Sequence, residues 1–180
     1  METFKGPLGS HRNYIHHIAL ENFLEYNMLC GLNKENGNNQ TSDKYKECRY
    51  FLNAIESMNN ILDYLYFEHE DEVRQSSLKC FKRAVWDKYP ELEQLANLAN
   101  AYKHCVREGR GGKNPNLPWA KDLQSPKLNV NVKISSPLNV NVSADYEFPW
   151  PITEHEDILD NGFKFWVAYV QHDGCDLKSV

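Results

Sequence analysis

The sequence contains no uninterrupted run of apolar residues that approaches the ~20 needed to cross a bilayer. It also has no excess of positive charge, because 20 Lys and Arg face 25 Asp and Glu and the formal net charge is -5. A protein that binds nucleic acid over its whole surface is usually basic, so any such contact must come from a local patch. The five cysteines are scattered and form no CxxC pair. We therefore predict a cytoplasmic protein with reduced thiols and no membrane anchor.

Several short motifs with well-defined chemistry are missing as well. The stretch GRGGK (109–113) lacks the spacing of a phosphate-binding P-loop, and no GxSxG or HExxH occurs. His16 and His17 are adjacent rather than one helical turn apart, and we interpret His69 and His155 as solvated surface residues. The sequence therefore predicts neither a metal site nor a cofactor.

Apolar residues recur at steps of three and four through much of the first 110 residues, which is typical of amphipathic helices. The longest such pattern runs from Tyr45 to Leu65. Similar patterns cover residues 13–32 and 73–88, and a fourth begins at Pro90, which suits the first turn of a helix. Further along, Thr153 and Glu156 have the spacing of a capping box and predict the start of a fifth helix.

Between the fourth and fifth predicted helices, two near copies of Leu-Asn-Val-Asn-Val alternate apolar and polar residues. This period of two predicts a β-hairpin over about residues 127–143. A two-stranded hairpin is only marginally stable alone, so we predict that its apolar face packs on the bundle or on the last helix while its Asn residues face water. The apolar face comprises Leu128, Val130, Val132, Leu138, Val140 and Val142.

The domain organisation follows from these patterns. Residues 1–12 are expected to be a disordered or tag-like leader, because GPLGS (6–10) resembles the remnant of a cleaved purification tag. Residues 13–170 are expected to form a single helical domain, and residues 171–180 a tail.

A cluster of polar and basic residues marks the end of the fourth predicted helix. Asn100 and His104 are four residues apart and share one helix face. Basic side chains follow in a protein that is acidic overall: Lys103, Arg107, Arg110 and Lys113. Such a patch can contact the phosphates of RNA. It also suits a solvated helix end, where the helix dipole favours cations without any function.

The order of these elements resembles that of small prokaryotic proteins in the HEPN (higher eukaryotes and prokaryotes nucleotide-binding) superfamily. The likeness rests on the long helix ending in LDYLYFEH (62–69), on LANLANAYKH (95–104) and on FKFW (163–166) in the final helix. It covers about residues 13–170, and the motif Asn-x-x-Lys-His points to one branch of the superfamily. The resemblance implies a mainly α fold, with a four-helix HEPN-like bundle, a C-terminal β-hairpin and a fifth packing helix.

The resemblance also implies a chemistry. Active members are metal-independent endoribonucleases with an arginine, a polar residue, three variable residues and a histidine. The polar residue corresponds to Asn100 and the histidine to His104, whereas Ala99 stands at the arginine position. In that reaction His104 would move a proton while a ribose 2′-hydroxyl attacks the adjacent phosphate.

Three functional hypotheses follow. The favoured one is an RNA-binding or partner-binding component of a prokaryotic antiviral defence or toxin–antitoxin system, with weak or no catalysis. The second is an active endoribonuclease that uses Asn100 and His104, with RNA held by Lys103, Arg107, Arg110 and Lys113. The third is a structural interaction subunit of a larger complex. The expected partners are RNA and either a second copy of the chain or a protein encoded nearby.

Overall fold

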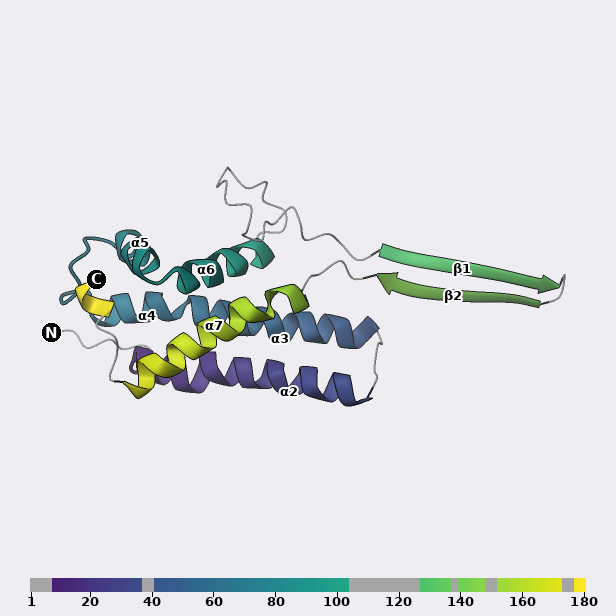
Figure 1. The fold of residues 1–180 in the computed structure, drawn as a ribbon, viewed down its shortest axis with the longest axis horizontal. Coiled ribbons are helices and arrows are strands. Elements are labelled where there is room, and N and C mark those ends of the chain that lie inside the picture. Colours follow the sequence, from purple (N-terminus) through teal and green to yellow (C-terminus); the bar gives the residue numbers. More distant parts are fainter. Residues whose placement is uncertain (1–7, 37–40, 104–126, 137–138, 148–151, 173–176) are drawn as a thin grey trace.

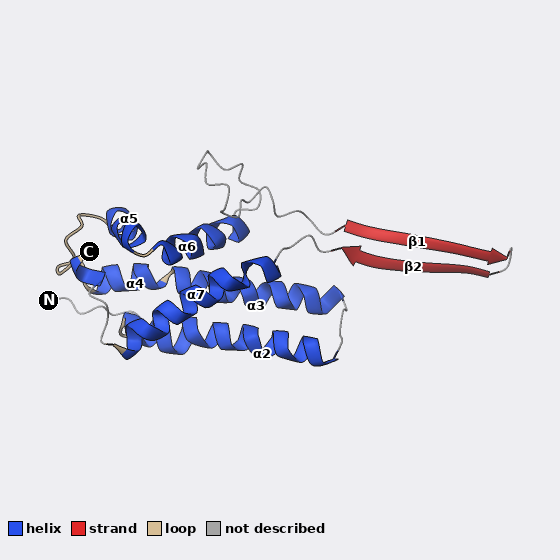
Figure 2. Cartoon of the chain, viewed as in Figure 1, coloured by secondary structure: helices blue, strands red, loops and turns tan. Residues whose placement is uncertain are grey.

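The protein is mainly helical, with one two-stranded antiparallel sheet (Figures 1 and 2). The computed structural model describes residues 8–36, 41–103, 127–136, 139–147, 152–172 and 177–180. Its helical elements are α1 (His11–Tyr14), η1 (Ile15–Ala19), α2 (Leu20–Asn36), α3 (Thr41–Asn59), α4 (Ile61–Glu68), α5 (Leu78–Lys88), α6 (Pro90–Lys103), α7 (Ile152–Gln171) and η3 (Leu177–Ser179). The strands are β1 (Lys127–Ser136) and β2 (Asn139–Glu147).

The helices match the sequence prediction in kind and differ from it in their ends. The predicted helix over residues 45–65 is divided at Asn60 into α3 and α4, at a residue type that favours turns over helix interiors. The helix predicted over residues 73–88 begins only at Leu78, because the Ser77 side chain accepts a hydrogen bond from the Cys80 N–H and caps α5 there. The last helix begins at Ile152, which places Thr153 inside its first turn rather than at the predicted cap.

The first helix is continuous from α1 to α2 but passes through the π-helical turn η1. Its start is fixed by Ser10, whose hydroxyl accepts a hydrogen bond from the Asn13 N–H at 3.1 Å. Helical structure therefore begins at His11, inside the segment predicted as a leader. At the other end of the chain Leu177 is buried, so the segment predicted as a tail also joins the core.

One apolar core holds the helices together. In it α2 packs on α3, while α6 packs on both α3 and α7. Several helices contribute large, fully buried side chains to it, among them Tyr26, Phe51, Phe81, Leu98, Leu159 and Trp166. Burial of each such side chain contributes about 1.5–3 kcal/mol, so this core rather than local helix propensity stabilises the bundle.

The hairpin forms as predicted, but the predicted docking of its apolar face is wrong. Val132 lies opposite Val142 and Val130 opposite Ala144 in the antiparallel register. Figure 1 shows the two strands projecting away from the helices, and Leu128, Val130, Val132 and Val142 are 52–65% exposed. Leu138 and the side chain of Val140 lie outside the described residues. The alternation of apolar and polar residues determines which side chains share a face of the hairpin. It does not determine whether that face packs on the helices of the same chain.

Candidate functional site

The last turn of α6 carries the described part of the predicted RNA site. Asn100 and Lys103 are both exposed there. The Lys103 Nζ lies 3.4 Å from Oε2 of Glu56 on α3, in an ion pair that is open to water. Exposed pairs of this kind contribute at most about 1 kcal/mol, so the Lys103 ammonium can exchange this partner for a phosphate.

Ala99 is adjacent to Asn100 on α6 but faces the core. It is only 1% exposed and belongs to the core, so an arginine at this position would have to bury its charge. A small apolar residue at position 99 therefore fits the packing of the core. His104, Arg107, Arg110 and Lys113 lie outside the described residues.

A tyrosine–histidine pair adjoins Lys103. The Tyr102 hydroxyl lies 3.2 Å from Nδ1 of His155, which comes from the first turns of α7. Burial lowers the pKa of His155 although Glu154 raises it, and burial raises the pKa of Tyr102. The neutral forms are therefore favoured, and the tautomer of the His155 ring determines which of the two groups donates. The interpretation of His155 as a solvated surface residue is wrong, since it is half-buried and joins α7 to α6.

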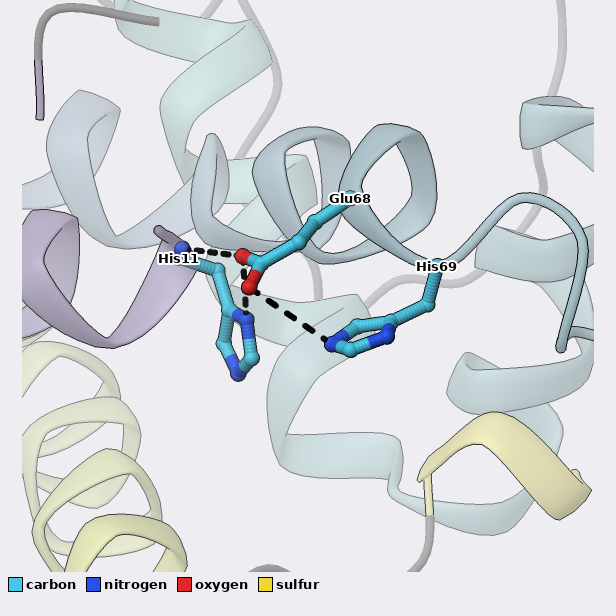
Figure 3. A group of neighbouring side chains, drawn as sticks. All are labelled: His11, Glu68 and His69. Atoms are coloured by element: carbon cyan, nitrogen blue, oxygen red, sulfur yellow. Dashed lines mark hydrogen bonds and ion pairs between the residues drawn. The ribbon is translucent and has the colours of Figure 1, made fainter. Parts of the chain in front are cut away.

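A second cluster lies where the start of the first helix meets the end of α4. It consists of His11, Glu68 and His69 (Figure 3). Nδ1 of His11 is 2.7 Å from Oε2 of Glu68, and the His11 backbone N–H donates to the same oxygen. Nε2 of His69 approaches Oε1 of Glu68 at 3.8 Å. The carboxylate of Glu68 therefore lies between two imidazole rings.

The outer nitrogens of both histidines also have partners. Nε2 of His11 lies 3.0 Å from the hydroxyl of Tyr169 on α7, and Nδ1 of His69 lies 3.3 Å from Oε1 of Glu72. Burial lowers the pKa of His11, even though the adjacent Glu68 carboxylate raises it. Contacts with α4 and α7 thus fix the orientation of the His11 ring.

This cluster is not predicted from the sequence, for two reasons. His11 lies within the segment predicted as a leader, and His69 lies in an acidic run and was interpreted as a solvated surface residue. That interpretation of His69 is wrong, because its side chain is only 16% exposed. The adjacency of Glu68 and His69 was the only local signal, since His11 is 57 residues away from Glu68.

Comparisons with protein-family models, curated proteins and solved structures return no match for this chain. None of the helices in the described part of the chain has both the length and the apolar character of a membrane span.

Proposed function

We propose that the protein is a cytoplasmic, HEPN-like interaction component of a prokaryotic defence or toxin–antitoxin system, with weak or no catalytic activity. The mainly helical bundle and the order of its helices support the HEPN-like assignment. The buried Ala99 at the arginine position supports weak or absent catalysis. The exposed apolar face of the hairpin arm, defined as β1 and β2, carries the proposal that the protein works by binding a partner.

The hairpin arm has two chemically different faces. Leu128, Val130 and Val132 alternate along β1 with Asn129 and Asn131, and all five are exposed. Isolated two-stranded hairpins are marginally stable in water, and large contiguous apolar patches are typical of interaction surfaces. A partner that covers the apolar face would remove that surface from water and stabilise the arm, at about 25 cal/mol for each Å² buried.

The partner we favour is a second copy of this chain. The protein exposes another apolar strip on α2, where Leu24, Met28 and Leu32 are 45–70% exposed and follow one another at four-residue steps. In a two-fold dimer the arm of each copy can lie on the α2 strip of the other, which covers both surfaces in both chains. A ribbon of this length covers roughly 300 Å², so the contact would extend from the strip along the rest of α2. Two reciprocal contacts would then bury about 1,200 Å², the lower end of specific interfaces.

The experiment is sedimentation velocity over a wide range of protein concentration. The wild-type protein is expected to dimerise, and Val130→Asp is expected to shift it to monomer. Asn131→Asp is the matched control, because it places the same charge on the next residue of β1, on the other face of the arm, and should leave the dimer intact. Dimerisation that survives Val130→Asp would exclude the arm as the contact. A wild-type monomer at every concentration would exclude the second copy.

RNA is the second candidate partner. It is favoured by the exposure of both Asn100 and Lys103 on the last turn of α6. Binding of single-stranded RNA should persist in EDTA and weaken steeply with salt, because each phosphate contact releases counterions. Lys103→Ala should weaken binding, whereas Lys79→Ala, an exposed lysine on α5, should not.

Catalysis is tested separately from binding. His104→Ala should remove any cleavage but leave binding largely intact, because the imidazole would move protons while the cations hold phosphate. Equal cleavage by the wild-type protein and by His104→Ala would exclude the ribonuclease mechanism. Absence of RNA binding at low salt would exclude the nucleic-acid proposal altogether.

A further inference from the structure

We propose that His11, Glu68 and His69 form a binding site for a divalent transition-metal ion, with zinc as the ion that their donor atoms suit best. Each residue offers one donor atom, and these atoms lie within 4.8 Å of one another (Figure 3). Two imidazoles and one carboxylate are a common zinc ligand set. This inference is independent of the proposed partner binding.

The distances are close to those that zinc requires. Bonds of about 2.0–2.2 Å in a tetrahedral site place the ligand atoms roughly 3.4 Å apart. Two separations within the cluster bracket this value: Nδ1 of His11 is 2.7 Å from Oε2 of Glu68, and Nε2 of His69 is 3.8 Å from Oε1 of Glu68. Displacements of about 1 Å would admit the ion, and the partly exposed Glu68 and His69 side chains can supply them.

In each histidine of the cluster, one ring nitrogen is hydrogen-bonded to an oxygen outside the cluster and the other is directed at Glu68. A metal-bound imidazole normally donates its other N–H to a carboxylate or another oxygen. His69 can donate from Nδ1 to Glu72, which leaves Nε2 as the donor atom toward the ion. His11 can donate from Nε2 to Tyr169, which leaves Nδ1 facing Glu68. In both rings the nitrogen that faces Glu68 can thus bind an ion, and at His11 the ion would displace the proton that Nδ1 donates to the carboxylate.

The surroundings also restrict the geometry of the ion. His11 is 4% exposed, whereas Glu68 and His69 are partly open to solvent, so an ion would enter on their side. Three protein ligands leave a fourth position for water. Nitrogen donors disfavour Mg²⁺, which prefers oxygen ligands in octahedral geometry. A bound ion would connect the first turn of the first helix to the end of α4, and through Tyr169 to α7.

The experiment measures Zn²⁺ binding by the full chain after removal of metal with a chelator. Titration against a chromophoric zinc indicator should give one ion per chain, and Mg²⁺ should not compete. His69→Ala and Glu68→Gln should each weaken binding at least tenfold. His17→Ala is the matched control, because His17 is exposed on the first helix and outside the cluster. Glu68→Gln keeps an oxygen to accept the His11 N–H and so separates loss of the ligand from loss of folding.

Two further measurements keep the result unambiguous. The thermal unfolding midpoint should rise with Zn²⁺ in the wild-type protein and in His17→Ala, but not in His69→Ala, because a ligand that binds only the folded state stabilises it. Co²⁺ should give the absorption of a nitrogen- and oxygen-ligated site without a thiolate charge-transfer band. A thiolate band, or zinc affinity unchanged by both His69→Ala and Glu68→Gln, would overturn the proposal.

Discussion

Replacing Gly162 by alanine tests how closely α6 and α7 pack. Gly162 is buried on α7, and a Cβ added there would lie 3.0 Å from Cδ2 and 3.3 Å from Cδ1 of Leu95 on α6. Alanine in place of glycine inside a helix gains about 1 kcal/mol of stability. Because Leu95 is only 1% exposed and has little room to move, overpacking should cost about 1–3 kcal/mol. We expect a net change between zero and a loss of about 2 kcal/mol.

Gly31 provides the matched control, because it lies on the exposed surface of α2 with no atom within 4 Å of an added Cβ. Gly31→Ala should therefore stabilise the protein by up to about 1 kcal/mol. A second control removes the obstacle itself. Valine at position 95 lacks the Cδ atoms, so Gly162→Ala should become stabilising in a Leu95→Val background.

Urea unfolding followed by far-UV circular dichroism measures all of these variants, with the midpoint and the slope fitted separately. If Gly162→Ala stabilises the otherwise unchanged protein as much as Gly31→Ala does, the close approach of α7 to Leu95 is wrong. The same result would undermine the placement of His155 beside Tyr102, because that pair depends on the same contact between α6 and α7.

Two further predictions concern ionisable side chains. Burial raises the pKa of the Cys48 thiol to about 11, so iodoacetamide near neutral pH should modify the exposed Cys80 first and Cys48 only after unfolding; peptide mapping by mass spectrometry distinguishes the two. Burial raises the pKa of Tyr14 from 10.0 to about 12, so folding favours the neutral phenol. That contribution is complete below pH 10 and is lost as the pH rises toward 12, and the free energy of unfolding should fall over this range. Tyr14→Phe should reduce the fall, as measured by urea unfolding at several pH values, whereas an equal fall in the variant would rule out Tyr14 as a contributor.

The helices were the most predictable part of the fold, because their apolar residues repeat with the period of the helix itself. Pro90 marked the start of α6 correctly, since a proline costs nothing in a first turn. The break at Asn60 was missed because the apolar pattern continues on both sides of it. The start of α5 was also missed, because it is set by a hydrogen bond to the Ser77 side chain and not by the apolar pattern.

The arrangement of functional groups was less predictable, because it depends on contacts between distant segments. The strand pattern predicted the pairing of β1 with β2, yet nothing local to Val130 or Val142 indicated that their face would remain exposed. Similarly, His11 meets Glu68 only because the first turn of the chain's first helix packs on the end of α4. Asn100 and Lys103 were identified from sequence because both lie within one turn of a single helix.

The π-helical turn η1 has a consequence for how the N-terminal end could be shortened. A π-helical turn takes up one more residue than an α-helical turn. The extra residue changes the rotation of α1 relative to α2 about the helix axis, so the side chains of each segment face their own partners. If residues 11–36 formed an uninterrupted α-helix of the same length, the first turn would be rotated by about 100° relative to α2, and His11 would face away from Glu68. One of the exposed residues His16 and His17 can therefore be deleted with both ends of the helix still in place, whereas a two-residue deletion would separate His11 from its partners.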